Sequence, residues 1–417
     1  MQKYDQETVD HLYNSFTLDR YLSQPEILYR LQTNLLPYQK SIWEDILSKR
    51  RMQGRKTALL DQNGNNLWYV VTPSIDSTIH EIDFRAKDEL RRIVSSEIHK
   101  NVVFDSLIDE AFYSSVIEGA FSTKKRTREL VDTKDPKNKS ERMILNNYNG
   151  LLYILENINT SLNVELFLKL HNIITENTLE PDEISEKYRD DLVCIMDENA
   201  INTMPIYTAP KDEDVQQMMN SLFTFIGDES TFIHPLIKSC IIHYYIVYVH
   251  PFFDGNGRVA RAFSYMYLLQ QGYDFFTFFS ISSVVNQKRK KYYKAIKDSE
   301  DFSSDMTYFI KAYLEMTNTS VSEVIEKLVK ELNHEILIMN LKNDEIYLNT
   351  RQTKILNILK RKDNNLLTIE EYRKRMKVSY ETARRDLSEL ESLGIFKKMK
   401  NGKKFIFKYL GTKGYTE

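Results

Sequence analysis

Twelve residues at positions 250–261, HPFFDGNGRVAR, combine a base, a carboxylate, a glycine-rich turn and two arginines. Gly255, Asn256 and Gly257 can take backbone conformations with positive φ, which point successive N–H groups into one concavity. The apolar-periodic run that follows predicts a helix, and the N-terminus of a helix is a favourable place for an anion. The segment therefore predicts a site for a chain of phosphates.

The charged residues of this segment fit the same purpose. Arg258 and Arg261 lie three residues apart, hence on one face of the predicted helix, so both guanidinium groups can reach the same phosphates. Asp254 supplies a hard oxygen ligand for Mg²⁺. One carboxylate suffices, because Mg²⁺ keeps several waters and takes further ligands from the phosphates of a nucleotide.

His250 follows the apolar run Ile241–Val249, and Pro251 ends the helix that this run predicts. The imidazole should therefore stand at the mouth of the loop. Its ordinary pKa of about 6.5 leaves it largely neutral at neutral pH, able to accept the proton of a Ser, Thr or Tyr hydroxyl that attacks phosphorus. Phosphoryl and nucleotidyl transfer depend mainly on positioning and charge neutralisation, which the neighbouring residues would supply.

The segment resembles the Fic motif, HPFx(D/E)GNGRxxR, at every fixed position. The resemblance implies a Mg²⁺-dependent protein adenylyltransferase that moves AMP from ATP to a protein hydroxyl, its own included. His250 would be the base, Asp254 the metal ligand, and the anion and phosphate ligands Gly255, Asn256, Gly257, Arg258 and Arg261. Relatives that phosphorylate have a lysine at the second glycine, so Gly257 favours AMP transfer. The structural alternative is a helical corner with a surface histidine.

Ser114–Gly119 is similar to the inhibitory motif of the same family, (S/T)xxxE(G/N), and lies before the core as in one class of relatives. The resemblance implies an inhibitory helix at about residues 110–119 that carries Ser114 and Glu118. Glu118 would pair with Arg261 and keep the ATP γ-phosphate from its productive position. A carboxylate in the last turn of a helix meets the negative end of the dipole, which favours a nearby cation. A solvated glutamate is the alternative. In this class the glutamate can also assist removal of AMP, so a de-AMPylating hydrolase stays open.

The remaining pattern predicts a mainly α fold. We expect a mixed N-terminal segment at residues 1–95, with a hairpin around Asn63-Gly64, and a Fic helical core at residues 96–317. Alternation predicts a β-hairpin at about residues 188–210. In Fic proteins that hairpin is the flap, which binds the target peptide by strand addition, although an ordinary surface hairpin would look the same. Two aromatic residues are candidates for the adenine pocket or for plain core: Tyr292 and Tyr293.

Residues 318–349 predict a helical linker, and residues 350–417 predict three helices followed by a hairpin, the order of a winged helix. Ser379–Leu387 is similar to the recognition helix of winged-helix regulators of the sugar-phosphotransferase repressor family. The resemblance implies that Arg384 and Arg385 contact DNA, with lysines along the wing. Docking to a protein is the alternative.

Charge is distributed unevenly along the chain. Residues 351–417 contain 18 Lys and Arg against 8 Asp and Glu, whereas the whole chain has a net charge of −2. An acidic body with a basic tail indicates two different partners. Two hypotheses follow: an autoinhibited adenylyltransferase, or a DNA-bound regulator whose Fic domain senses nucleotide.

Composition and the chain's first residues predict its environment. Cys194 and Cys240 are too few for a disulfide framework, which favours a reducing compartment. The start at Met1–Glu7 predicts no signal peptide, and the longest apolar stretch, Cys240–Val249, is too short for a membrane span. We therefore expect a cytoplasmic protein without membrane contact, and the sequence leaves a homo-oligomer open.

Overall fold

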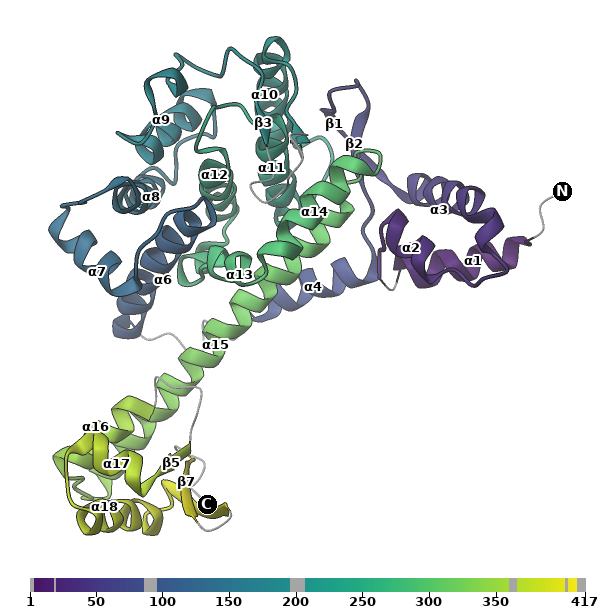
Figure 1. The fold of residues 1–417 in the computed structure, drawn as a ribbon. Coiled ribbons are helices and arrows are strands. Elements are labelled where there is room, and N and C mark those ends of the chain that lie inside the picture. The colour runs from purple at the N-terminus through teal and green to yellow at the C-terminus, as the bar shows by residue number, and fades with distance from the viewer. Residues whose placement is uncertain are drawn as a thin grey trace, which may run out of the picture. The chain divides into compact units, whose positions relative to one another are not determined.

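The computed structural model of the chain describes residues 4–18, 20–85, 96–195, 207–359, 366–401 and 404–410. Helices dominate the described residues, and the strands form small antiparallel sheets (Figure 1). The chain divides into two compact units, the first extending to Val321 and the second formed mainly by residues from Ser322 onward. The mainly α fold expected from the sequence is confirmed.

The first unit begins with three helices and a hairpin. Their bounds are α1 (Gln6–Tyr13), α2 (Gln24–Arg30), α3 (Gln39–Gln53), β1 (Arg55–Leu60), β2 (Asn66–Tyr69) and α4 (Pro73–Phe84). β1 pairs with β2 in antiparallel fashion, and Gly64 in the connection has φ 78°, as the Asn-Gly signal predicts. The indole N–H of Trp68 donates to Ser303 O at 2.8 Å, so this segment packs on the helical body of the same unit.

The helical body follows. Its elements are α6 (Ser96–Ile117), α7 (Lys124–Thr133), α8 (Lys139–Glu156), α9 (Val164–Thr175), α10 (Asp212–Gly227), α11 (Pro235–Val249), α12 (Asn256–Gln270), α13 (Ile281–Gln287), α14 (Arg289–Asp301) and α15 (Thr307–Asn343). Nearly every residue of α11 is buried, because this helix is apolar on all sides and lies at the centre of the body. α11 and α12 pack against each other on either side of the loop at residues 250–255 (Figure 1).

Two short strands stand where the flap was expected. β3 (Cys194–Ile195) pairs in antiparallel fashion with β4 (Tyr207–Thr208), with Cys194 opposite Thr208. The middle of the expected flap, residues 196–206, lies outside the described residues. β4 lies close to α11, since the Tyr207 hydroxyl donates to Tyr248 O at 2.6 Å.

The second unit has the order of elements expected for a winged helix. It contains the end of α15 and then α16 (Thr350–Leu359), β5 (Leu366–Thr368), α17 (Ile369–Met376), α18 (Tyr380–Ser392), β6 (Phe396–Asn401) and β7 (Lys404–Tyr409). The sheet order is β5-β7-β6, and its core is apolar. The expected turn at Asn401-Gly402 lies partly outside the described residues. Sequence patterns did not predict β5, which has only three residues.

Candidate functional site

His250 stands at the C-terminal end of α11, in the left-handed conformation with φ 52° and ψ 59°. Its Nδ1 faces Val247 O at 3.3 Å. A carbonyl oxygen only accepts, so Nδ1 carries the hydrogen and the lone pair of Nε2 is free to accept a proton. Burial lowers the pKa of His250 below its ordinary value, which favours the neutral imidazole.

The loop after His250 leads into the N-terminus of α12. Gly255 caps the helix with φ 88°, and a Cβ there would lie 2.6 Å from Thr175 Cγ2. The expectation of positive φ at Asn256 and Gly257 is wrong, because both residues already belong to the first helical turn. Their N–H groups point out of a helix N-terminus rather than into a separate turn. The Asn256 amide instead holds the loop, since its Oδ1 accepts from Phe252 N at 2.9 Å.

The two arginines of α12 are almost fully enclosed, with exposed fractions of 0% for Arg258 and 4% for Arg261. Arg258 Nη2 donates to Asp254 Oδ2 at 3.0 Å and Nη1 donates to Ile174 O at 3.2 Å. Within the described part of the chain, Arg258 Nε and Arg261 Nη1 are buried without a hydrogen-bond acceptor. Such donors are costly to leave unpaired, which makes them suited to an anionic ligand.

Glu118 and Ser114 lie against Arg261. Arg261 Nη2 donates to Glu118 Oε1 at 2.9 Å and to Ser114 O at 2.8 Å, and Arg261 Nε donates to Ser114 Oγ at 2.9 Å. The carboxylate also covers the first turn of α12, because a Cβ added to Gly257 would lie 2.2 Å from Glu118 Oε1. We refer to these two residues as the Glu118–Arg261 pair. The structure brings together the residues that the two motifs single out, although 132 positions separate Glu118 from His250.

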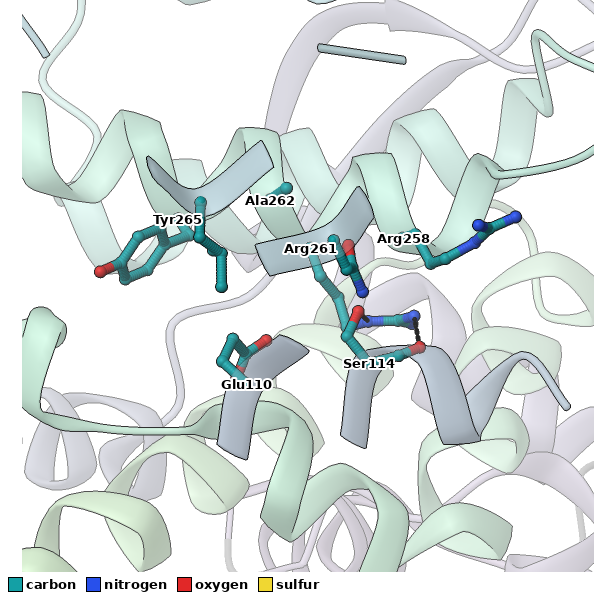
Figure 2. Close-up of a pocket in the computed structure, with 8 residues that line it drawn as sticks. Glu110, Ser114, Arg258, Arg261, Ala262 and Tyr265 are labelled. Carbon is teal, nitrogen blue, oxygen red and sulfur yellow. Dashed lines mark hydrogen bonds between the residues drawn. The ribbon is translucent and has the colours of Figure 1, made fainter. Parts of the chain in front are cut away.

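α6, which ends at Ile117 directly before Glu118, packs against α8 and α12. A cavity of about 10 Å³ remains between α6, α8 and α12, room for a single water molecule. Figure 2 shows Ser114 and Arg261 facing each other beside it, with Glu110 and Tyr265 along its wall. Glu110 also fixes α6 from its other side, since its carboxylate accepts from Ser280 Oγ and Ser282 N, each at 3.0 Å.

Three residues that support the candidate site were not predicted from the sequence. Arg189 Nε donates to His250 O at 2.8 Å. The His171 ring stacks on Phe252 with centroids 3.5 Å apart, and its Nε2 lies 3.0 Å from Asp254 O. Arg289 donates to Ile117 O at the C-terminal end of α6. The contacts of Arg189, His171 and Arg289 reach residues that are 61, 83 and 172 positions away, respectively. No local sequence pattern could therefore have identified these three residues.

The two tyrosines expected near adenine differ in position. Tyr292 is buried in the core, where its hydroxyl lies 2.9 Å from His243 Nε2. Tyr293 is 46% exposed, and the Arg289 guanidinium lies 5.9 Å from its ring centroid. The negative charge of Glu118 contributes to raising the pKa of Tyr293 after the larger effect of burial, so this tyrosine lies near the Glu118–Arg261 pair.

The donor set at Asp254 fits a magnesium ion that a nucleotide brings with it. Asp254 is partly exposed beside the helix N-terminus, and its Oδ1 and Oδ2 each accept one hydrogen bond and keep further lone pairs. Within the described ranges no three His, Cys, Asp or Glu side chains gather as a metal cage. Mg²⁺ suits a single carboxylate of this kind, because it takes its other ligands from waters and phosphates.

The candidate DNA contacts lie on α18. Arg384 and Arg385 are exposed, and Arg385 pairs loosely with Glu389 at 3.9 Å. The next residue, Asp386, is fully buried and accepts from Arg351 Nε at 2.8 Å and from the Tyr372 hydroxyl at 2.9 Å. These bonds fix α18 against α16 and α17, so the exposed arginines stand on a well-anchored helix.

Two protein-family models match separate parts of the chain. Residues 161–268 match the Fic/DOC family, and residues 351–408 match the DeoR-like helix-turn-helix domain. The chain is 26% identical over 182 residues to a protein adenylyltransferase Fic of Nematostella vectensis, covering 42% of this chain and 40% of the relative. A protein of the same description from Drosophila yakuba is 24% identical over 265 residues, covering 60% and 49%. The chain spans about half the length of the curated relatives it matches.

A solved structure extends the likeness to the fold. A Fic family protein from Desulfovibrio desulfuricans superposes with a TM-score of 0.52 at 17% identity, covering 82% of this chain and 98% of that chain. At this identity the likeness concerns the fold alone. Together with the family matches, it shows that the chain carries a Fic domain followed by a DeoR-like helix-turn-helix domain.

Proposed function

We propose that the protein is an adenylyltransferase that moves AMP from ATP to a hydroxyl side chain of a protein, and that Glu118 holds it in an inhibited state. The observation that carries the proposal is the position of Glu118 Oε1, which accepts from Arg261 and covers Gly257 in the first turn of α12. An acidic side chain there occupies the place that the helix N-terminus and the arginine offer to a phosphate.

The transfer step uses residues of this chain only for positioning and proton transfer. The hydroxyl oxygen forms a bond to the α-phosphorus, the bond from that phosphorus to the β-bridging oxygen breaks, and pyrophosphate leaves. His250 Nε2 accepts the hydroxyl proton as the bond forms. The first turn of α12 and the two arginines oppose the negative charge on the phosphates.

Asp254 would hold a magnesium ion together with the phosphates of ATP. The ion, when bound, would offset the negative charge of the phosphates. The Arg258 contact keeps the Asp254 carboxylate at the edge of the loop. The His171 contact to Asp254 O fixes its main chain.

The same geometry supports inhibition through competition. Glu118 and a phosphate both need Arg261, whose remaining buried donor, Nη1, would lie 3.3 Å from a Cβ on Gly257. Removing the carboxylate frees Arg261 and the space over Gly257. The Glu118→Gly variant is therefore the active form to measure.

The test is incorporation of label from ATP marked at the α-phosphate or at the γ-phosphate, into cell protein and into the chain itself. Glu118→Gly should take up α-label strongly, and Glu118→Gly with His250→Ala should take up none. Glu156→Gly is the matched control, because Glu156 is an exposed glutamate at the end of α8. Uptake of γ-label instead would indicate a kinase, and uptake of neither label by any variant would refute the proposal.

A second function, DNA binding, is supported by the exposed arginines of α18 in the DeoR-like domain. We infer that Arg384 and Arg385 would face the major groove, because such domains insert their recognition helix there. Affinity measured by fluorescence anisotropy on duplex DNA should fall steeply with salt and fall again in Arg384→Ala. Affinity that is insensitive to salt and to both arginines would make the domain a protein-docking module.

A further inference from the structure

Arg189 joins two segments of the candidate site through main-chain carbonyls. It lies just before β3 and is only 2% exposed. Its guanidinium donates to His250 O at 2.8 Å, to Asp191 O at 2.7 Å, to Val249 O at 3.4 Å and to Pro210 O. Its own N–H donates to Pro251 O at 2.9 Å. One residue therefore contacts the carbonyls of positions 249, 250 and 251.

The charge of Arg189 serves these carbonyls rather than an ion pair. In the part of the chain that is described, no carboxylate lies within ion-pair distance of it, although Asp191 and Asp212 lie near enough to act through their charge. Burial lowers the pKa of Arg189, but an arginine stays charged in proteins. The cation faces the last carbonyls of α11, which form the negative end of the helix dipole.

The backbone at His250 needs such support. A residue other than glycine is strained in the left-handed region and persists there only where its surroundings hold it. Arg189 binds the carbonyl of His250 and those on both sides of it. The direction of the imidazole follows from that backbone conformation.

Both ends of the flap meet at the same guanidinium. Asp191 O precedes β3, and Pro210 O follows β4. The Tyr207 hydroxyl adds a bond from β4 to Tyr248 O. A movement of the flap strands thus changes the bonds that hold the end of α11.

We propose that Arg189 is a positioning residue that couples the flap to the base: it holds the backbone of His250 and both ends of the flap in one arrangement, so that a protein segment paired with the flap meets the imidazole correctly. This inference rests on the proposed adenylyl transfer. A lysine at this position keeps the charge but offers one nitrogen for four carbonyls in different directions. It should therefore fail to replace arginine.

The test compares Arg189→Lys and Arg189→Gln in the Glu118→Gly chain. Transfer to protein should fall by about 10- to 100-fold, as expected for a misplaced reacting group, while the Kd of Mg·ATP stays within about twofold. Arg50→Lys is the matched control, because Arg50 is also fully buried and also donates to carbonyls, those of Phe16 and Leu22. It should lower the melting temperature comparably without a selective loss of kcat. A folded Arg189→Lys chain with transfer within about twofold of its parent would overturn the proposal, as would an equal loss of ATP affinity.

A second measurement separates this proposal from the proposed function. If the Glu118→Gly parent transfers nothing, the proposed function fails, and amide hydrogen exchange alone judges Arg189. Exchange at 188–195, 207–212 and 249–252 should then rise together in Arg189→Lys and stay unchanged in Arg50→Lys. Unchanged exchange at any of these three segments in Arg189→Lys would refute the coupling.

Discussion

Single side chains hold the end of α6, which places Glu118. Arg289 donates to Ile117 O, the last carbonyl of the helix, directly before Glu118. A cation at a helix C-terminus stabilises the unpaired carbonyls there. Arg289 therefore holds the segment that places Glu118 against Arg261, without touching the carboxylate's own hydrogen bond.

Replacement of Arg289 by alanine should raise the basal transfer rate of the otherwise unchanged chain by about fivefold, since a hydrogen bond of this kind contributes about 1 kcal/mol. In the Glu118→Gly chain the same replacement should add nothing further. The rate of α-label uptake measures both. Lys290→Ala is the control, because Lys290 is the exposed neighbour. A rate that falls in the Glu118→Gly chain would instead assign Arg289 to nucleotide binding.

The proton acceptor makes a prediction about pH. Burial and Arg189 lower the pKa of His250, while Val247 O, Glu118 and Asp254 raise it, and the net direction is below the ordinary value of 6.5. A base with a lowered pKa stays neutral in more acidic solution. The Glu118→Gly chain should therefore keep more than half of its maximal kcat at pH 6.5. A pH–rate profile whose acidic limb has its midpoint at or above that value would contradict this assignment.

At the scale of helices and strands, the second unit depends on one buried carboxylate. Asp386 accepts hydrogen bonds from Arg351, Tyr372 and Asn349, and so joins α18 to the elements before it. Burial would raise its pKa, but these bonds outweigh that effect and lower it. The carboxylate is therefore charged at neutral pH, and its removal leaves the Arg351 cation without its partner.

Asp386→Ala should cost the second unit about 1–3 kcal/mol of unfolding free energy, the usual effect of leaving a buried donor such as the Tyr372 hydroxyl without its acceptor. Hydrogen exchange at the amides of α17 and α18 measures this loss within the full chain. Affinity for DNA should decrease with it, whereas α-label uptake in the Glu118→Gly chain should not change. Glu381→Ala, an exposed acidic position on the same helix, is the control. Equal exchange in both variants would show that Asp386 does not anchor α18.

Much of this arrangement could be predicted from local patterns. Strong signals gave α11 from its apolar run, α18 from its Ser379 cap, and the β1–β2 hairpin from Asn63-Gly64. β5 escaped because three residues carry no recognisable alternation. The sequence suggested that Gly257 is a glycine because of its conformational freedom. The structure shows instead a helical residue that has no space for a Cβ. That reason involves Glu118, far away in the chain, so no local pattern contains it.

The contacts that hold the site together depend on the folded chain as a whole. Arg189, His171 and Arg289 each look like an ordinary polar residue in sequence, because their acceptors lie in distant segments. The sequence likewise did not indicate a role for the N-terminal segment. In the structure this segment packs against the start of α15.

Arg50 is the centre of that packing. It is fully buried, donates to the Tyr308 hydroxyl at 2.8 Å and to Thr17 Oγ1 at 2.9 Å, and lies 4.1 Å from the ring centroid of Tyr21. Tyr21 in turn donates to the buried Asp305. The network joins residues more than 250 positions apart, so residues 4–85 should unfold together with the helical body.

Arg50→Met should lower the unfolding free energy of the first unit by about 3–5 kcal/mol, because it removes the buried guanidinium and leaves the buried groups that accept its hydrogen bonds without a donor. Thermal unfolding followed by limited proteolysis measures it, with cleavage expected in both the N-terminal segment and the start of α15. Arg51→Met is the control, since Arg51 is the exposed neighbour. Cleavage confined to residues 4–85 would show that the N-terminal segment unfolds by itself.

The Glu118–Arg261 pair has a consequence for the whole molecule that concerns mass action. In the proposed function Glu118 is tethered to the chain that it inhibits, so it competes for Arg261 at a fixed effective concentration. A free nucleotide competes at its actual concentration, and the fraction of active chains must follow the ratio of the two. Any partner that moves α6 away from α12 would lower the effective concentration of Glu118 at Arg261. Such a partner would raise the fraction of active chains without contacting the nucleotide. We therefore expect the activity of the proposed enzyme to rise gradually with nucleotide concentration. The concentration that gives half of the full activity would depend on how firmly the end of α6 is held.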